Sequence, residues 1–288
     1  MADAPSLADA LREARALLAV QREIAGPVRY LAGAAARDAR PAVSARPAVP
    51  PVTPDAPPAA LSTDDDSDVP DLFGALPDPS QDESLSPYER VEALIPEDSP
   101  LREMQSLEEI DAWLSKTVLV PIDEDRVNPV LGTGDPDADL MIVGEAPGAD
   151  EDRLGEPFVG RAGQLLNKIL EAVLFTREET YITNILKSRP PNNRDPLPEE
   201  VEAHIPVLYK QIALVRPKMI LAVGKSAGNG LLGRKSSLAS LRGKFQDFYG
   251  IPLLVTYHPA ALLRNPQWKR PTWEDVKLLR THYDQLVG

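Results

Sequence analysis

Short apolar runs alternate with longer amphipathic stretches in the second half of the chain, and this alternation restricts the fold more than any other feature. The runs that predict strands cover residues 139–143, 180–185, 218–223 and 252–257. Helical patterns lie between and after them, near residues 161–174, 198–214, 225–232 and 272–286. Strands that are joined through helices form parallel sheets with helices on both faces. We therefore expect an α/β fold with three α/β/α layers around a central, mainly parallel sheet of four strands.

The first hundred residues differ in composition and predict two further regions. Residues 1–40 carry apolar residues at helical spacing between positions 7 and 24, which indicates an amphipathic helical extension. Residues 41–100 are expected to be a disordered, Pro-rich and acidic linker, because ten of the 30 prolines fall within 41–80 and such a composition cannot bury a core. The folded domain is then expected at 101–288, with a helix that begins near Leu107 after the cap residue Ser106.

The formal net charge of -13 is unevenly distributed along the chain. Residues 1–125 hold 10 Lys and Arg against 25 Asp and Glu, whereas residues 126–288 hold 21 against 19. The second part can therefore present a basic face to a polyanion, although solvated surface charge is the simpler interpretation of any single residue. No apolar run approaches the roughly 18 residues that span a bilayer, and the N-terminus resembles no secretory signal or transit peptide. A cytoplasmic location is expected.

Three unusual loops follow predicted strands. Their sequences are GEAPGADEDRLGEPFVG at 144–160, YITNILKSRPPNNRDP at 181–196 and VTYHPAALLRNP at 255–266. Each loop alone could be a turn shaped by glycine, proline and asparagine. However, the carboxyl ends of parallel strands meet at one edge of a sheet, where ligands bind. Together the loops predict one shared pocket.

The ordered motifs GEAPG, PFVG, ITN, KSRPPNNR and HPAALLR resemble those of the family 4 uracil-DNA glycosylases, from about Thr117 to the C-terminus. The resemblance implies a uracil-DNA glycosylase-like fold and a monofunctional enzyme of base excision repair. Such an enzyme hydrolyses the N-glycosidic bond of uracil in DNA, releases uracil and leaves an abasic site. The implied partner is uracil-containing DNA, single- or double-stranded, bound by a monomer. The N-terminal extension could in addition recruit a repair or replication protein.

The resemblance also implies the roles of the pocket residues. Phe158 would stack on the flipped base, and the amide of Asn184 would read uracil O4 and N3–H. His258 would donate a hydrogen bond to O2 as negative charge develops on the leaving base. Without the motifs, a core phenylalanine, a turn-closing asparagine and a structural histidine would be the ordinary interpretations. The remaining expected uracil-binding residues are Gly144, Ala146 and Gly148.

The water-activating group cannot be the residue at Ala146, where the best-known uracil glycosylases carry an aspartate. Glu151 is the candidate base, with Glu145 as a second carboxylate or pocket wall. Leu262 or its neighbour Leu263 is expected to wedge into the base stack, with core packing as the alternative. The expected DNA-binding residues are Lys187, Arg189, Arg194, Arg242, Lys244, Leu262 and Arg264.

The chain contains no cysteine, which separates it from the family pattern. The resemblance implies a four-iron cluster held by four cysteines, and the motifs place Thr117, Val120, Ser188 and His204 at those positions. Iron–sulfur clusters of this kind need thiolate ligands. We therefore expect no cluster, no metal and no soluble cofactor, with packing and polar contacts in the place of the cluster.

Two other functions fit part of this pattern. A non-catalytic DNA-binding or scaffold protein could retain the fold after losing the cluster, and it would bind uracil-containing and normal DNA alike. A glycosylase for another deaminated base, hypoxanthine or xanthine, could use the same loops, although Asn184 and Phe158 suit uracil better.

Overall fold

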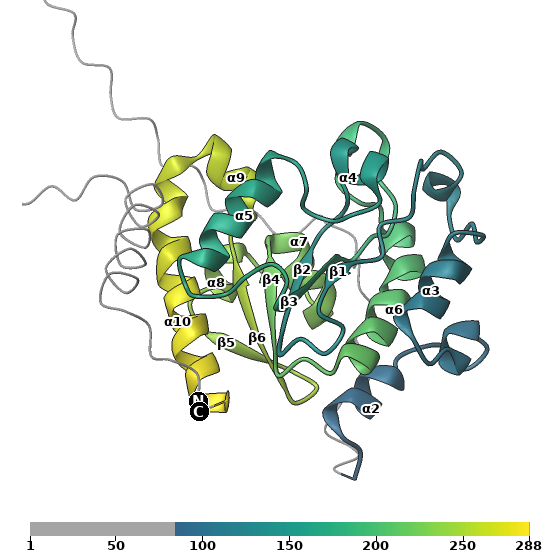
Figure 1. The fold of residues 1–288 in the computed structure, drawn as a ribbon, viewed down its shortest axis with the longest axis horizontal. Coiled ribbons are helices and arrows are strands. Elements are labelled where there is room, and N and C mark those ends of the chain that lie inside the picture. Colours follow the sequence, from purple (N-terminus) through teal and green to yellow (C-terminus); the bar gives the residue numbers. More distant parts are fainter. Residues whose placement is uncertain (1–83, 288) are drawn as a thin grey trace, which may run out of the picture. The chain divides into compact units, whose positions relative to one another are not determined.

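Six strands form the sheet of the computed structural model, which describes residues 84–287 (Figure 1). The strands are β1 (Thr133–Gly134), β2 (Leu140–Gly144), β3 (Thr180–Asn184), β4 (Met219–Val223), β5 (Phe245–Phe248) and β6 (Ile251–Thr256), in the spatial order β1-β3-β2-β4-β6-β5. The central four, β3, β2, β4 and β6, are parallel and correspond to the four predicted strands, so the α/β fold class is confirmed. The antiparallel edge strands β1 and β5 were not predicted.

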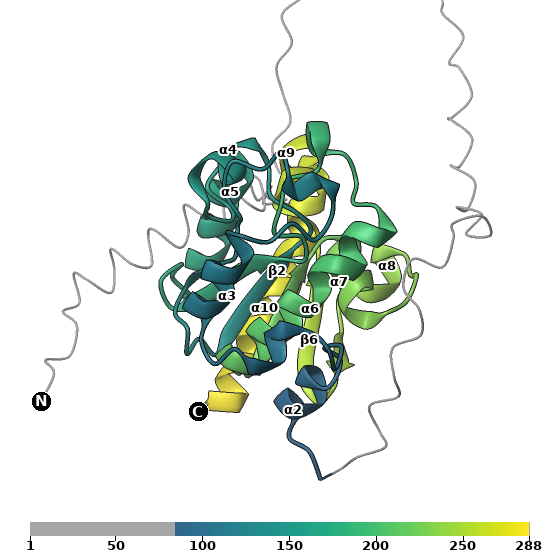
Figure 2. The same cartoon turned by 90° about the vertical axis from the view of Figure 1, so that its right-hand side faces the viewer.

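Both faces of the sheet are buried, as the unbroken apolar runs require. Side chains alternate along a strand, so Leu140 and Ile142 of β2 enter one core while Met141 and Val143 enter the other. The first core is covered by α5 (Arg161–Glu171), α9 (Pro259–Arg264) and α10 (Lys269–Val287). The second is covered by α2 (Pro87–Glu92), α3 (Leu107–Leu114), α6 (Pro198–Val215), α7 (Lys225–Leu232) and α8 (Leu238–Leu241), and Figure 2 is turned toward this side.

The long helices agree with the sequence periodicity. They are α5 (Arg161–Glu171), α6 (Pro198–Val215), α7 (Lys225–Leu232) and α10 (Lys269–Val287). Shorter helices, α4 (Ala149–Leu154), α8 (Leu238–Leu241) and α9 (Pro259–Arg264), lie in the loops that follow the strands. The 3-10 turns are η3 (Pro100–Glu103), η4 (Pro121–Asp123), η5 (Pro191–Asn193) and η6 (Pro266–Trp268). Among residues 84–287, no helix combines the length and apolarity needed to cross a membrane.

The folded domain begins earlier than the expected boundary at residue 101. Helix α2 (Pro87–Glu92) packs against α6, and Val91 and Ile95 are buried. The expected linker 41–100 is therefore wrong over residues 84–100, because these residues do bury apolar surface against α6. The predicted helix after Ser106 is confirmed as α3 (Leu107–Leu114), with the Ser106 side chain accepting a hydrogen bond from the Glu109 amide. The expected extension 1–40 and linker residues 41–83 lie outside the described residues.

Candidate active site

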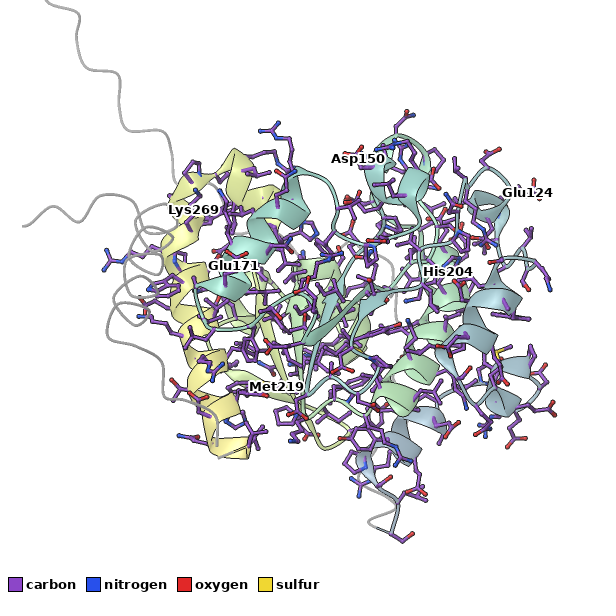
Figure 3. All side chains as sticks on the ribbon, in the orientation of Figure 1. Glu124, Asp150, Glu171, His204, Met219 and Lys269 are labelled. Carbon is purple, nitrogen blue, oxygen red and sulfur yellow. The ribbon has the colours of Figure 1, made fainter. Side chains whose placement is uncertain are left out.

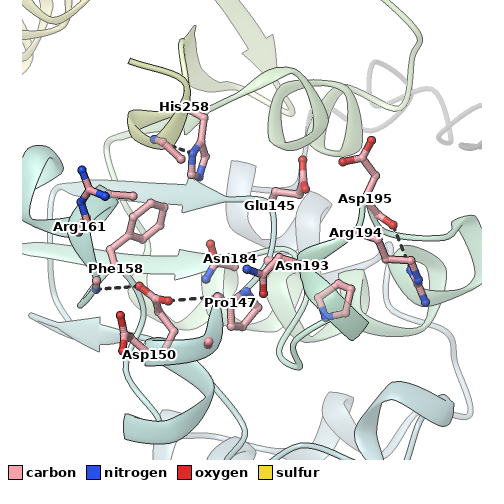
Figure 4. Close-up of a pocket in the computed structure, with 18 of the residues that line it drawn as sticks. Glu145, Pro147, Asp150, Phe158, Arg161, Asn184, Asn193, Arg194, Asp195 and His258 are labelled. Carbon is pink, nitrogen blue, oxygen red and sulfur yellow. Dashed lines mark hydrogen bonds between the residues drawn. The ribbon is translucent and has the colours of Figure 1, made fainter. Parts of the chain in front are cut away.

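A cavity of about 540 Å³ opens at the carboxyl ends of β2, β3 and β6, where the three motif-bearing loops meet (Figure 4). The shared pocket predicted from the loops is therefore present. The lining residues come from all three loops, and they are Glu145, Ala146, Pro147, Gly148, Ala149, Asp150, Glu151, Phe158, Gly160, Arg161, Ala162, Asn184, Pro190, Asn193, Arg194, Asp195, His258, Ala260 and Arg264.

Gly144 allows two of the predicted site residues to meet. It ends β2 and pairs in register with Asn184 at the end of β3. A Cβ atom at position 144 would lie 2.2 Å from Oδ1 of Asn184 and 2.6 Å from Cζ of Phe158. Real Cβ atoms do not approach other heavy atoms so closely. Glycine at this position therefore keeps open the place where the amide and the aromatic ring come together.

Asn184 carries an unusual polar atom. The residue is 1% exposed, and its buried Oδ1 has no hydrogen-bond partner among residues 84–287. Buried polar atoms are normally paired, since an unsatisfied acceptor costs about 1–3 kcal/mol. An orphaned acceptor at the wall of a cavity is suited to receive a donor from a ligand.

Phe158 is held in a backbone conformation that a bulky residue rarely adopts, with φ at 54°. Arg177 stabilises this turn, because its guanidinium donates to the carbonyl of Phe158 at 3.2 Å and also to the carbonyl of Pro157. The ring lies 5.6 Å from the His258 ring, centroid to centroid, at an angle of 32°. The strained turn thus directs the ring to the histidine and the pocket (Figure 4).

His258 caps helix α9, and its Nδ1 accepts a hydrogen bond from the Ala260 amide at 3.2 Å. The proton of the neutral ring therefore lies on Nε2, which is left to donate to a ligand. Burial, together with the positive charge of Arg264, lowers the pKa of His258 to about 4. The residue is consequently a neutral hydrogen-bond donor at physiological pH.

The two candidate carboxylates have different surroundings. Oε1 of Glu151 accepts from the amides of Val159 and Gly160 at 3.0 Å each, and Oε2 accepts from Gly148 at 3.1 Å. Glu151 thereby joins the GEAPG loop to the PFVG turn. Burial raises the pKa of Glu145, against a hydrogen bond with Ser226 that lowers it. A raised pKa makes a carboxylate a stronger proton acceptor.

Two of the expected DNA-binding residues, Arg194 and Arg264, line the cavity, whereas Arg189 and Lys244 are not among its lining residues. Arg264 and Lys244 are exposed. Arg194 is partly exposed but forms a bidentate ion pair with Glu200, at 2.6 and 2.9 Å. The Nε of Arg189 donates to Oδ1 of Asn193 at 2.6 Å.

Two of the expected DNA contacts are wrong and a third is engaged elsewhere. Lys187 is fully buried, its Nζ lies 2.6 Å from the carbonyl of Asn184, and burial lowers its pKa well below the ordinary value. Leu262 is also fully buried in the core beneath α9, so core packing is the correct alternative, while Leu263 is 41% exposed. Arg242 pairs with Asp275 at 2.9 Å and is largely covered. A residue in a polar loop can thus point inward, which its sequence context did not indicate.

The polar lining residues that the sequence analysis did not assign to the site are Asp150, Arg161, Asn193 and Asp195. Arg161 begins helix α5 directly after the PFVG turn, and Asn193 lies in the PPNNR motif. Asn193 has a left-handed backbone, with φ at 54°, which turns the loop back toward the pocket. The sequence did contain a signal for Asn193, because this residue stands in the PPNNR motif that follows Asn184.

The residues at the expected cluster positions do not fit an iron–sulfur cluster. Thr117, Val120, Ser188 and His204 offer no sulfur, whereas such a cluster requires thiolates. Each position instead contacts the side chain of Asp123 or Arg126. Burial alone would raise the pKa of Asp123, but its contacts with His204 and Ser188 outweigh burial and hold the pKa below the ordinary value.

The family assignment agrees with this fold and pocket. A model of the uracil DNA glycosylase superfamily matches residues 131–277, which contain the sheet and all three site loops. This match covers half of the chain, so the chain belongs to the uracil-DNA glycosylase superfamily.

Within the superfamily, the similarity is to the type-4 group. The chain is 39% identical over 182 residues to the type-4 uracil-DNA glycosylase of Archaeoglobus fulgidus, covering 60% of this chain and 92% of the relative. The type-4 enzyme of Pyrobaculum aerophilum is 43% identical over 166 residues, with 55% and 85% covered. That of Thermotoga maritima is 39% identical over 175 residues, with 59% and 91% covered. The protein is thus a cysteine-free member of the type-4 uracil-DNA glycosylases.

Proposed function

We propose that this type-4 member removes uracil from DNA by hydrolysis of the N-glycosidic bond, releasing free uracil and leaving an abasic site. The observation that carries the proposal is the buried, unpaired Oδ1 of Asn184 beside the Phe158 ring. Uracil N3–H would supply the missing donor, while the amide nitrogen would donate to O4. Cytosine presents an acceptor at N3 and a donor at C4, so it would leave both atoms of the amide mismatched.

His258 supplies the second requirement, because the departing base becomes negatively charged as the bond breaks. Its Nε2–H would donate to uracil O2 as this charge develops. A neutral imidazole stabilises the uracil anion through a hydrogen bond and keeps its own proton. Burial lowers the pKa of His258 and so keeps the ring neutral. The ring also lies next to Phe158, on which the flipped base would stack.

We assign water activation to Glu145 rather than to Glu151. Glu151 already accepts three backbone hydrogen bonds, and its protonation would weaken these hydrogen bonds, which connect two site loops. We therefore assign Glu151 the role of positioning the GEAPG loop and the PFVG turn. Glu145 lines the same cavity and has a raised pKa, as a general base requires.

The DNA strand would cross the rim formed by α9 and the PPNNR loop. Arg264 and Lys244 are available to contact phosphates, and the exposed Leu263 takes the place of Leu262 as the residue that enters the base stack. We propose that the enzyme acts as a monomer in the cytoplasm, needs no metal or soluble cofactor, and accepts single- or double-stranded substrate. A partner of the N-terminal extension belongs to the same proposal.

Release of uracil from a labelled single-stranded oligonucleotide tests this function. Under single-turnover conditions, Asn184→Ala should lower the rate at least about tenfold, which corresponds to roughly 1.4 kcal/mol of lost transition-state stabilisation. Gln164→Ala is the matched control, because Gln164 is an exposed amide on α5 outside the cavity. Oligonucleotides with thymine or cytosine should stay intact. Folded protein that binds uracil-containing and normal DNA equally, without product, would instead support a DNA-binding role.

A further inference from the structure

Three of the four positions at which the family pattern places cluster ligands, Val120, Ser188 and His204, meet around a single carboxylate, that of Asp123. Its Oδ2 accepts from the amides of Leu119 and Val120, at 2.7 and 3.1 Å. Its Oδ1 accepts from the hydroxyl of Ser188 and lies 3.3 Å from Nε2 of His204. One side chain therefore contacts the segment after α3, the segment after β3, and helix α6.

Arg126 adds the fourth position and balances the charge. Its Nη1 lies 3.2 Å from Oδ1 of Asp123 and 3.2 Å from the Ser188 hydroxyl. Its Nη2 donates to the carbonyl of Thr117 at 2.8 Å and to that of Leu114. We refer to Asp123, Arg126, Ser188 and His204 as the Asp123 network.

The network is buried. The side chains of Asp123 and His204 are 0% exposed and that of Arg126 is 7% exposed. Pairing of buried charges roughly offsets their desolvation, so such a pair adds little net stability, whereas loss of one partner leaves an uncompensated charge. A buried ion pair of this kind favours the one arrangement of chain segments in which both charges are paired. Three chain segments that are far apart in sequence are thereby held in one arrangement.

A short path leads from the network to the uracil pocket. Nδ1 of His204 accepts from the backbone amide of Lys187 at 2.8 Å, and Figure 3 marks His204 on α6 on the side of the domain that carries α3. The buried Nζ of Lys187 lies 2.6 Å from the carbonyl of Asn184 and 2.8 Å from the hydroxyl of Thr183. His204 therefore fixes the chain three residues beyond Asn184.

We propose that the Asp123 network is a metal-free tie that takes the structural place of the family's iron–sulfur cluster. Through His204 and Lys187 it positions Asn184 at the end of β3. Its members are positioning residues, since none of them lines the cavity. The link to Asn184 rests on the proposed uracil recognition, whereas the tie itself does not.

The ion pair is tested by a double-mutant cycle on the full chain. Asp123→Asn and Arg126→Gln should each lower Tm by about 10 °C, because each leaves a buried charge unpaired. The double variant should lose less than the sum of the two shifts, since it removes both charges. Additive shifts, or shifts no larger than that of the exposed pair variant Arg153→Gln, would overturn the tie.

The link to the pocket is tested by two substitutions of His204. His204→Asn places a side-chain oxygen near the position of Nδ1 and can still accept from Lys187, whereas His204→Gln reaches toward Asp123 and loses that acceptor. Single-turnover uracil release should fall about tenfold in His204→Gln and stay within about twofold of wild type in His204→Asn, with DNA affinity unchanged in both. His282→Asn and His282→Gln on α10 are the matched controls. Equal rates for the two His204 variants would overturn the positioning role.

Iron content distinguishes failure of the tie from failure of the proposed function. The purified full-length protein should carry far less than one iron per chain and show the Tm coupling of the cycle. Stoichiometric iron in active protein would overturn the metal-free tie while the glycosylase function stands. Metal-free protein with the Tm coupling but no uracil release would instead leave the tie in place and overturn the proposed function.

Discussion

The uracil pocket and the Asp123 network are both buried polar regions, but their polar atoms differ in whether they face a cavity or the protein itself. In the pocket, Oδ1 of Asn184 has no partner and Nε2 of His258 is left to donate. In the network, both oxygens of Asp123 accept hydrogen bonds from the protein itself, and Nε2 of His204, which makes no regular hydrogen bond among residues 84–287, faces Oδ1 of Asp123 at 3.3 Å rather than a cavity. Unpaired buried polar atoms are costly unless a ligand pairs them. The difference separates residues that recognise a ligand from residues that hold the chain.

The largest expected effect follows from removing the donor at the pocket. His258→Ala should lower the rate of uracil release by about 10²–10³-fold, the usual effect of losing one hydrogen bond to a developing anion. The free energy of unfolding should fall by only about 1 kcal/mol, because the substitution also removes the side-chain cap of α9. Single-turnover kinetics and a denaturant titration check the two parts. A variant that keeps the wild-type rate would remove His258 from the chemistry.

A single methyl group at the junction of β2 and β3 gives the next largest effect. Gly144→Ala would place Cβ 2.2 Å from Oδ1 of Asn184 and 2.6 Å from the Phe158 ring. Displacement of either group should reduce kcat/KM by about 10- to 100-fold. A Gly144→Ala variant with the wild-type kcat/KM would contradict the close-approach argument.

The pH dependence distinguishes the histidine from the carboxylate. Burial raises the pKa of Glu145, so a base at this position is protonated, and the rate lost, as pH falls through that raised value. The pKa of His258 is about 4, so the ring is protonated only at a lower pH than Glu145, whose pKa is raised. Glu145→Gln should be slow and should lose the fall in rate at the raised pKa of Glu145, so that only the fall caused by protonation of His258 remains. A mutant profile that keeps the wild-type shape would reject Glu145 as the base.

The smallest expected effect concerns the DNA backbone. Arg264→Ala should weaken DNA binding moderately and reduce the slope of log affinity against log salt by about 0.9, the value for one phosphate contact in duplex DNA. Lys187→Met should leave that slope unchanged, because Nζ is buried against protein oxygens. Affinities over a salt series measure both. A reduced slope for Lys187→Met would mean that the lysine reaches phosphate after all.

The core of the fold could be predicted because periodicity records burial. The four parallel strands and the long helices bury complete apolar faces, and their boundaries agree with the sequence pattern. Strand β1 has two residues, Thr133 and Gly134, and no pattern of that length is informative. The place of residues 87–95 in the folded domain was missed because helix α2 is only six residues long and lies in a region rich in proline and acidic residues.

The pocket was predicted from its motifs, while the direction of individual side chains was not. Helix α9 has only six residues, so nothing in the sequence decided whether Leu262 or Leu263 faces inward. Lys187 is buried through contacts with Thr183 and Gln211, and Gln211 lies on a distant helix. Asp123 was not recognised because its partners come from three segments that only the fold brings together. Such tertiary contacts leave no local pattern in the sequence.

The most direct test of the central claim is uracil release by full-length protein whose iron content has been measured in the same sample. The central claim is that the pocket built around Asn184 and His258 is complete without a cluster. It predicts that metal-free wild type releases uracil from single-stranded DNA, leaves thymine and cytosine in place, and loses this activity in His258→Ala. Activity that rises and falls with bound iron, or folded metal-free protein that releases no uracil, would contradict it.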